Sequence, residues 1–260
     1  MSGMLFVIDG TDGSGKHTQA EKLYNTLCSV YNLTKDKDIT MVSFPRYGSS
    51  SATMVEKYLN GEFGSDPNKI DPYTSSMFYM IDRSISFMND KWGEIYRNGG
   101  IVIADRYYTS NIIHQGAKIL SSEENMKKYD FEYFICWIKE LELDQIMLPA
   151  PDKIFWLMTD AKANDDMMKH RVDTNSEHVT DIHEANHDYL DLCRQALIKY
   201  KDYYETDLSH SVMNRKAYSP FSREIRREEF INVRNENGEL RSITNISNEI
   251  IQNVNEYLHP

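Results

Sequence analysis

The stretch LFVIDGTDGSGKHTQ, residues 5–19, joins a short apolar run to a glycine-rich segment and the start of a helical pattern. Phosphate-binding loops have a glycine, four further residues, a Gly-Lys pair and then a serine or threonine. The residues that fit this pattern are Gly10, Gly15 and Lys16. His17 stands where the hydroxyl residue is expected, and Thr18 follows one place later. The stretch therefore predicts a buried strand, a phosphate-binding loop and a helix, in that order.

Backbone geometry explains why this loop would hold a nucleotide. Glycines let several backbone N–H groups turn toward one phosphate, and the N-terminus of the following helix adds positive potential. Lys16 supplies a charge for the β- and γ-phosphates, and Thr18 or water could replace the missing hydroxyl ligand of magnesium. The candidate ATP-binding residues are Gly10, Thr11, Asp12, Gly13, Ser14, Gly15, Lys16, His17 and Thr18. The alternative is a plain glycine-rich turn between a strand and a helix.

The composition limits the class of protein. The chain has 260 residues and a net charge of −11, so we expect neither nucleic acid nor a membrane surface as a partner, since both need basic surfaces. No apolar run is long enough to span a bilayer, and no signal peptide precedes the first predicted strand. Cys28, Cys136 and Cys193 are widely separated, which favours a reducing, cytoplasmic location over a disulfide framework or a zinc site.

Alternating strand and helix patterns predict the fold class. Apolar runs predict strands at 4–9, 39–44, 101–104, 153–158 and 231–233. Helical spacing predicts helices at 16–31, 71–97, 110–120, 129–148, 181–204 and 243–257. This order is typical of an α/β fold: a P-loop NTPase-type parallel sheet of about five strands with helices on both faces. We expect a single domain over 1–260 with a lid at about 160–180, and we assign no structure to the polar segment 209–229.

Ligands of such sheets bind beyond the carboxyl ends of the strands. That rule brings GTDGSGKHT, FPRYG and DRYYTSN to one edge, because each follows a predicted strand. Asp105 ends a buried strand, where a carboxylate can hold magnesium directly or through water, and Arg106 can grip an acceptor phosphate. The alternative is a structural Asp–Arg pair that caps the next helix. The glycine loop nearby favours the functional interpretation.

Two weaker motifs could form the wall of an acceptor pocket. Candidates in SFPRYG for contact with a base, a sugar or a phosphate are Phe44, Pro45, Arg46 and Tyr47. In MFYMIDR, Phe78 and Arg83 lie on neighbouring faces of a predicted helix. The alternatives are a turn at the end of a strand, a core phenylalanine and a solvated arginine.

These four motifs, in this order, resemble those of the thymidylate kinase family, whose members phosphorylate dTMP with ATP. The resemblance runs from Leu5 to about Tyr204, and LPAPDKIFWL is similar to the family's entry into the fourth strand. It implies a nucleoside-monophosphate kinase domain that binds ATP and dTMP, uses Mg²⁺, closes a lid over the reactants and forms a homodimer.

The resemblance also implies roles for individual residues. Asp12 corresponds to a loop carboxylate that organises the transfer and the metal, and Lys16 to the lysine that bridges the phosphates. Arg106 corresponds to the clamp on the acceptor phosphate. The implied acceptor contacts are the wall formed by Phe44, Pro45 and Tyr47, the thymine-stacking ring of Phe78, the carbonyl donor Arg83 and the base-edge reader Asn111.

Three departures from the family pattern bear on the mechanism. His17 replaces a hydroxyl residue at a position where the family tolerates other side chains. His114 falls where the family usually has Tyr or Phe beneath the sugar, a ring that disfavours a 2′-hydroxyl. Gly13 occupies a position where some members carry a catalytic arginine, and members without it place basic residues in the lid. Arg171 is the candidate for that role here, with Lys169 as its alternative.

Two kinds of rival function remain open at this point. A kinase for another pyrimidine nucleotide or for a deoxynucleoside would keep the same fold. A deoxynucleoside kinase would place a carboxylate base after the second strand, where this chain has Phe44-Pro45-Arg46. The other rival is a non-catalytic nucleotide-binding module, in which His17 would indicate a degraded loop. The presence of Asp12 and Lys16 argues against this alternative.

Overall fold

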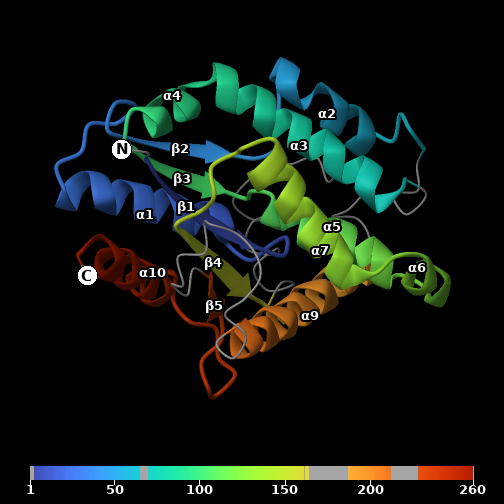
Figure 1. Cartoon of the computed structure of the whole chain (residues 1–260). Helices are drawn as coiled ribbons and strands as arrows, with labels where there is room; N and C mark the ends of the chain where they lie inside the picture. Colours follow the sequence, from blue (N-terminus) through green and yellow to red (C-terminus); the bar gives the residue numbers. More distant parts are fainter. Residues whose placement is uncertain (1–2, 65–69, 161, 164–186, 212–227, 260) are drawn as a thin grey trace.

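Five parallel strands carry the glycine loop and the other site motifs. The computed structural model describes residues 3–64, 70–160, 162–163, 187–211 and 228–259. Within them the strands are β1 (Met4–Gly10), β2 (Ile39–Ser43), β3 (Ile101–Asp105), β4 (Lys153–Met158) and β5 (Glu228–Asn232). The sheet order is β2-β3-β1-β4-β5, and every neighbouring pair is parallel (Figure 1). The predicted P-loop-type parallel sheet is confirmed.

Helices cover both faces of this sheet. Figure 1 shows α1 (Lys16–Val30) and α10 (Ile243–Leu258) on one side of the strands. On the other side lie α4 (Lys91–Arg97), α5 (Thr109–Leu120), α7 (Phe131–Lys139) and α9 (His187–Ser211). The remaining described helices are η1 (Ser50–Ala52), α2 (Thr53–Leu59), α3 (Pro72–Asn89), α6 (Glu123–Lys128) and the π-helix η3 (Glu140–Gln145).

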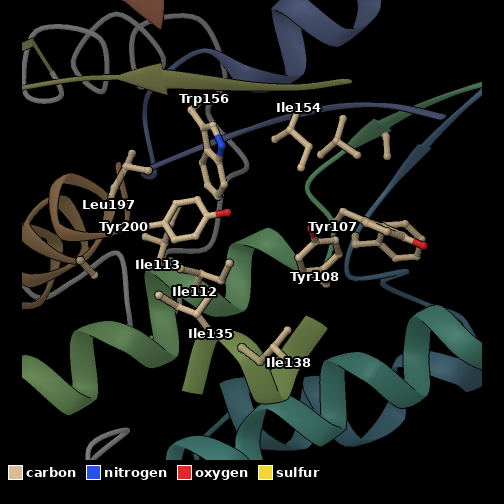
Figure 2. Close-up of a cluster of buried hydrophobic side chains, with 14 of the residues drawn as sticks. Tyr107, Tyr108, Ile112, Ile113, Ile135, Ile138, Ile154, Trp156, Leu197 and Tyr200 are labelled. Carbon is tan, nitrogen blue, oxygen red and sulfur yellow. The ribbon is translucent and has the colours of Figure 1, made fainter. Parts of the chain in front are cut away.

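The alternation of side chains along β1 explains the two layers. Leu5 and Val7 point into the core beneath α5 and α9, whereas Phe6 and Ile8 point into the core beneath α1 and α10. All four are fully buried, and each large apolar side chain buried in this way stabilises the fold by about 1.5–3 kcal/mol. Figure 2 shows the α5 side, where Ile112 and Ile113 lie between the helices and Trp156 packs near Tyr200. β1 is therefore held from both faces, which gives the loop that follows it a rigid base.

The helix boundaries differ from the sequence prediction in two places. The helix predicted over 71–97 is two helices, α3 and α4, because Asp90 has an extended backbone between them, with ψ of 164°. The helix predicted over 129–148 begins at Phe131, after Asp130 caps the Tyr133 backbone N–H, and widens into η3 from Glu140. Both predictions were wrong because helical spacing of apolar residues continues across a bend, so periodicity alone does not reveal the break.

Three smaller differences concern short elements and chain segments. The helices α2 and α6 were not predicted, and β5 begins three residues before the predicted strand at 231–233. The segment 209–229 has its first residues in α9 and its last two in β5, and 212–227 lies outside the described residues. Most of the predicted lid, with Arg171, lies in 164–186 and is also outside them.

The strand register brings three motifs to one edge of the sheet. Ile8 pairs with Asp105, and Ser43 pairs with the same Asp105 from the other side. The carboxyl ends of β1, β2 and β3 therefore lie together, each followed by one of the motifs GTDGSGKHT, FPRYG and DRYYTSN. This arrangement confirms that the three motifs lie at one edge of the sheet.

Candidate active site

The glycine loop has a backbone conformation that only glycine adopts without strain. Gly10, Gly13 and Gly15 have φ values of 149°, 77° and 84°. A Cβ atom on Gly10 would lie 2.7 Å from the Leu157 carbonyl oxygen on the neighbouring strand β4. Gly15 then stands at the N-cap of α1 in the left-handed conformation. The loop thus presents backbone N–H groups at a helix N-terminus, which is a binding site for anions.

Lys16 is buried beneath this loop among several charges. Its Nζ donates a hydrogen bond to the Thr11 carbonyl oxygen at 2.7 Å and lies 3.8 Å from Asp12 Oδ1. Burial lowers the pKa of Lys16 to about 8, Arg106 adds to the effect, and the carboxylates around it oppose it only partly. A phosphate beside Nζ would restore the charge, so the loop is built to receive an anion.

Arg106 and Asp12 form an ion pair across the site. Arg106 Nη2 donates to Asp12 Oδ1, and Arg106 itself has the left-handed φ of 68° that non-glycine residues rarely adopt. Burial alone would raise the pKa of Asp12, but Arg106, His114 and Lys16 together hold it well below its usual value. Asp12 is therefore a carboxylate at any pH near neutrality. Backbone strain at Arg106 is typical of residues placed for function.

Asp105 presents one partnered and one free carboxylate oxygen. Its Oδ2 lies 3.0 Å from His17 Nδ1 and 3.4 Å from Ser43 Oγ. Its Oδ1 is buried and has no hydrogen-bond partner among the described residues. Carboxylate oxygens are preferred ligands of Mg²⁺, so Asp105 and Asp12 fit the predicted metal site. No group of three or more metal-ligating side chains occurs in the described part of the chain, so phosphate oxygens and water would complete the coordination.

His17 does not replace the expected hydroxyl in a simple way. Its side chain is 63% exposed, and its Nε2 lies 3.5 Å from Glu21 Oε1, one helical turn further along α1. Thr18, the alternative hydroxyl, is half-buried. His17 therefore contacts the predicted metal ligand Asp105 and leaves its Oδ1 free.

A second ion pair is buried between α3 and η3. Arg83 on α3 donates from Nε to Glu142 Oε2 at 2.7 Å and from Nη2 to Glu142 Oε1 at 2.5 Å. Each side chain is only 2% exposed. The expected alternative of a solvated arginine is wrong, because Glu142 neutralises the charge inside the protein. No motif signalled Glu142, which lies among other acidic residues in a stretch that reads as an ordinary helix.

The remaining predicted acceptor residues occupy different environments. Phe44 is buried against Trp92 and Tyr107, and Phe78 packs against Phe63 at 5.5 Å between ring centroids. Arg46 Nε donates to Asp90 Oδ2, whereas its backbone N–H donates to Asp82. Pro45 is half-buried, Tyr47 is exposed and Asn111 is buried with its Nδ2 3.4 Å from the Ser76 carbonyl oxygen. The structure joins Phe44 to the core and leaves Tyr47 at the surface.

His114 links the Asp12–Arg106 pair to α9. Its Nε2 lies 3.4 Å from Arg106 Nη1 and 3.9 Å from Asp12 Oδ2. Its Nδ1 lies 3.5 Å from the hydroxyl of Tyr189 and 3.7 Å from Cys193 Sγ. The Tyr189 hydroxyl also donates to the His114 carbonyl oxygen at 2.9 Å. Tyr189 was missed by sequence reasoning, because no spacing relates α9 to α5.

Asp9 is a further site residue that motif reasoning missed. It is fully buried at the end of β1, and it accepts hydrogen bonds from Ser110 Oγ, the Thr109 hydroxyl and the Gly10 backbone N–H. Burial raises its pKa, although Lys16 and Arg106 oppose the change. Asp9 ties the start of the glycine loop to the start of α5. An acidic residue just before the first loop glycine was the available signal.

The fold and this site define a P-loop α/β nucleotide-binding protein. A family profile described as thymidylate kinase matches residues 8–212. The chain belongs to the thymidylate kinase family.

Individual relatives agree with this assignment. A thymidylate kinase of Mycobacterium tuberculosis is 27% identical over 150 residues, which are 57% of this chain and 63% of that protein. One of Desulfotalea psychrophila is 30% identical over 129 residues, 50% of this chain and 58% of that protein. The chain thus spans less than two thirds of the length of these relatives.

Solved structures support the fold over nearly the whole chain. A thymidylate kinase structure from Candida albicans has a TM-score of 0.62 at 16% identity and covers 98% of this chain and 92% of its own. One from Ehrlichia chaffeensis has a TM-score of 0.54 at 19% identity and covers 98% and 100%. At these identities the likeness concerns the fold alone.

Two further findings concern the helices and the cysteines. No helix in the described ranges has the length and apolar character needed to cross a membrane. The three cysteines are free thiols, and burial raises the pKa of the Cys193 thiol, whose Sγ lies 3.7 Å from His114 Nδ1.

Proposed function

We propose that the chain transfers the γ-phosphoryl group of ATP to dTMP, giving ADP and dTDP. The observation that carries this proposal is the meeting of Lys16, Asp12 and Arg106 at the carboxyl ends of β1 and β3. Membership of the thymidylate kinase family supports the choice of acceptor. A single nucleotide kinase domain over residues 1–260, with a lid at about 160–180, is part of the proposal.

The reaction needs positioning and charge more than it needs a base. Donor and acceptor are both phosphates, so the site must hold two anions in line and offset their repulsion. Lys16 lies under the glycine loop, where the donor phosphates would bind. Its positive charge would stabilise the negative charge that develops on them as the phosphoryl group moves. Lid closure would bring Arg171 to the same phosphates and exclude water.

Arg106 must change partners during the cycle. It donates a hydrogen bond to Asp12, so an acceptor phosphate would share or replace this contact. A phosphate offers the guanidinium a bidentate contact, which makes the exchange favourable. Asp12 would then be available to the metal. Binding of the acceptor phosphate to Arg106 would thus release Asp12 for contact with the metal.

Magnesium is the proposed cofactor, held by Asp105 and Asp12. The free Oδ1 of Asp105 and the ionised state of Asp12 suit a hard cation. When bound with ATP, the ion would neutralise charge on the β- and γ-phosphates. His17 and Ser43 would keep the Asp105 carboxylate in one orientation from its other oxygen.

Coupled release of ADP across a panel of acceptors tests the activity. The panel is dTMP, dUMP, UMP, CMP and AMP, each with ATP and Mg²⁺. We expect dTMP to be among the best acceptors. If CMP or AMP is preferred, the chain is a kinase for another nucleotide. If no acceptor supports turnover while ATP binds, the rival of a non-catalytic module replaces this proposal.

A homodimer is the proposed assembly, and α3 offers a surface for it. Met77, Ile81 and Met88 are exposed along this helix at spacings of four and seven residues, which places them on one face. The resemblance to the family supports the same assembly. Light scattering coupled to size exclusion should give twice the chain mass, and Ile81→Lys should reduce it to one. A monomeric wild-type protein at micromolar concentration would contradict this part of the proposal.

A further inference from the structure

Among the described residues, the pair formed by Arg83 and Glu142 is the most deeply buried ion pair that the proposed mechanism does not use. The two residues are 59 positions apart, and their contact joins α3 to η3. Burying two charges costs several kcal/mol of desolvation, and well-packed apolar residues often serve stability equally well. A buried pair with this geometry therefore calls for an explanation beyond stability.

In the part of the chain that the structure describes, hydrogen bonds engage only some of the donors of the Arg83 guanidinium. A guanidinium has five N–H donors in a rigid planar fork. Glu142 takes the Nε donor and one Nη2 donor, and the Tyr107 carbonyl oxygen lies 3.5 Å from Nη1, at the limit of a hydrogen bond. The remaining donors of Nη1 and Nη2 point away from Glu142, because the fork is planar. Glu142 thus fixes the plane, and within the described ranges the end of the fork has only the long contact with the Tyr107 carbonyl oxygen.

The free end of the fork lies beside residues of the proposed site. Tyr107 directly follows Arg106 in the loop between β3 and α5. Asn111 on α5 contacts the Ser76 carbonyl oxygen, two helical turns before Arg83 on α3. Residues two turns apart share a helix face, so Arg83 lies on the face of α3 that packs against α5. Arg83 and Asn111 therefore both lie where α3 packs against α5.

The π-helix explains how Glu142 reaches this position. Glu140 and Asp144, its acidic neighbours in η3, are exposed, whereas Glu142 is buried. Single turns of π-helix occur frequently at functional sites, because the wider turn redirects a side chain. Burial alone would lower the pKa of Arg83, but Glu142 raises it above its usual value. The guanidinium therefore stays charged and oriented.

We propose that Glu142 is a positioning residue that aims Arg83 at the carbonyl edge of a pyrimidine base and thereby selects thymine or uracil over cytosine. The inference rests on the proposed function. Thymine and uracil present a carbonyl oxygen at C4, which accepts from Arg83. Cytosine presents an amino group at C4. Its N–H donors would face the N–H donors of Arg83, and no hydrogen bond could form. Sites built to hydrogen-bond one group reject an analogue without it strongly, by up to about 10⁴-fold.

Glu142→Gln is the main test, because it keeps the shape and removes the charge that holds the fork. We expect the ratio of kcat/KM for dTMP to that for dCMP to fall about tenfold. The loss should lie in KM for dTMP, with kcat changing less than about threefold. Glu142→Asp keeps the charge and should restore part of the ratio. Equilibrium binding of dTMP and dCMP, without ATP, should show the same change in preference.

Glu228→Gln is the matched control for loss of a buried carboxylate. Glu228 is buried in the core, where it accepts from Trp156 Nε1 and from the Tyr200 hydroxyl, away from α3. It should lower the melting temperature without changing the dTMP to dCMP ratio. If Glu142→Gln lowers the melting temperature in the same way and leaves the ratio unchanged, the ion pair is structural and the proposal is wrong.

Two further outcomes are decided by the same measurements. If Glu142→Gln does not fold, Arg83→Lys keeps the charge and removes the fork, so an unchanged ratio in that variant overturns the proposal. If the wild-type protein does not phosphorylate dTMP, the proposed function fails. In that case the equilibrium binding of dTMP and dCMP still tests the role of Glu142. The proposal is wrong if Glu142→Gln leaves the preference for dTMP unchanged.

Discussion

The proposed phosphate end and the proposed base end of the site obtain their charges in different ways. At the phosphate end, Lys16 and Asp12 lie in one loop, and the motif that places them is continuous in sequence. At the base end, Arg83 depends on Glu142, which comes from a distant π-helix. The geometry of the loop is set by residues that are adjacent in sequence. The buried pair forms only when two distant segments of the folded chain meet. We therefore expect local substitutions to affect the chemistry most at the phosphate end and selectivity most at the base end.

The largest effect should follow Lys16→Ala. Loss of a preorganised charge from the donor phosphates should lower kcat about 10²–10³-fold, which corresponds to about 3–4 kcal/mol of transition-state stabilisation. Removing a buried lysine whose pKa is already depressed should not unfold the protein. Circular dichroism and thermal melting provide the control. Turnover near that of the wild type, with the fold intact, would contradict the role of Lys16.

Arg171→Ala should have the next largest effect. Gly13 supplies no cation at the loop, and Arg171 is the arginine of the predicted lid. We expect kcat to fall about 10²-fold, as for loss of one transition-state donor, while the affinity for dTMP stays nearly unchanged. Stopped-flow turnover and equilibrium binding of dTMP separate the two quantities. If kcat hardly changes, the lid cation is Lys169 or the lid supplies none, and Lys169→Ala distinguishes these cases.

The depressed pKa of Lys16 predicts a pH dependence that belongs to the phosphate end alone. Above pH 8 the ligand-free protein increasingly holds neutral Lys16, and bound phosphates favour the charged form. Binding of ATP should then take up close to one proton at pH 9 and almost none at pH 7, and affinity should fall by up to about tenfold per pH unit above 8.

Calorimetry in buffers of different ionisation enthalpy measures this proton uptake. Lys16→Ala is the control, since it should remove the uptake. Proton uptake that persists in Lys16→Ala would assign the titration to another group. Binding of dTMP to the base end should depend on pH much less over the same range.

The smallest effect should come from His114, which lies between the two ends. A residue under the sugar selects by contact with the 2′-hydroxyl, and such selection reaches only about 10²-fold. The imidazole is smaller than a phenol and is held toward α9 by Tyr189 and Cys193. His114→Tyr should therefore sharpen the preference for dTMP over its ribose counterpart several-fold, with less effect on ATP. An unchanged ratio would mean that His114 does not face the sugar.

Motifs with fixed local geometry were predictable from the sequence. The Gly10–Gly15–Lys16 pattern identified the loop, because positive φ angles and close approach to β4 leave glycine as the residue that fits. The alternation of apolar runs and helical stripes predicted a parallel sheet, and right-handed crossovers then placed Asp105 and Arg106 beside the loop. These inferences needed only spacing and chain connectivity.

Contacts between distant segments were decided by the tertiary structure. The sequence identified Arg83 and Asn111 as candidates, but it could not show that Glu142 neutralises Arg83 or that His114 meets Tyr189 and Arg106. It also missed the break at Asp90, since a helical stripe continues through a bend. A hydrogen-bond partner is chosen by distance in the folded chain, and hydrophobic periodicity carries no information about which polar side chains become neighbours across α3, α5, η3 and α9.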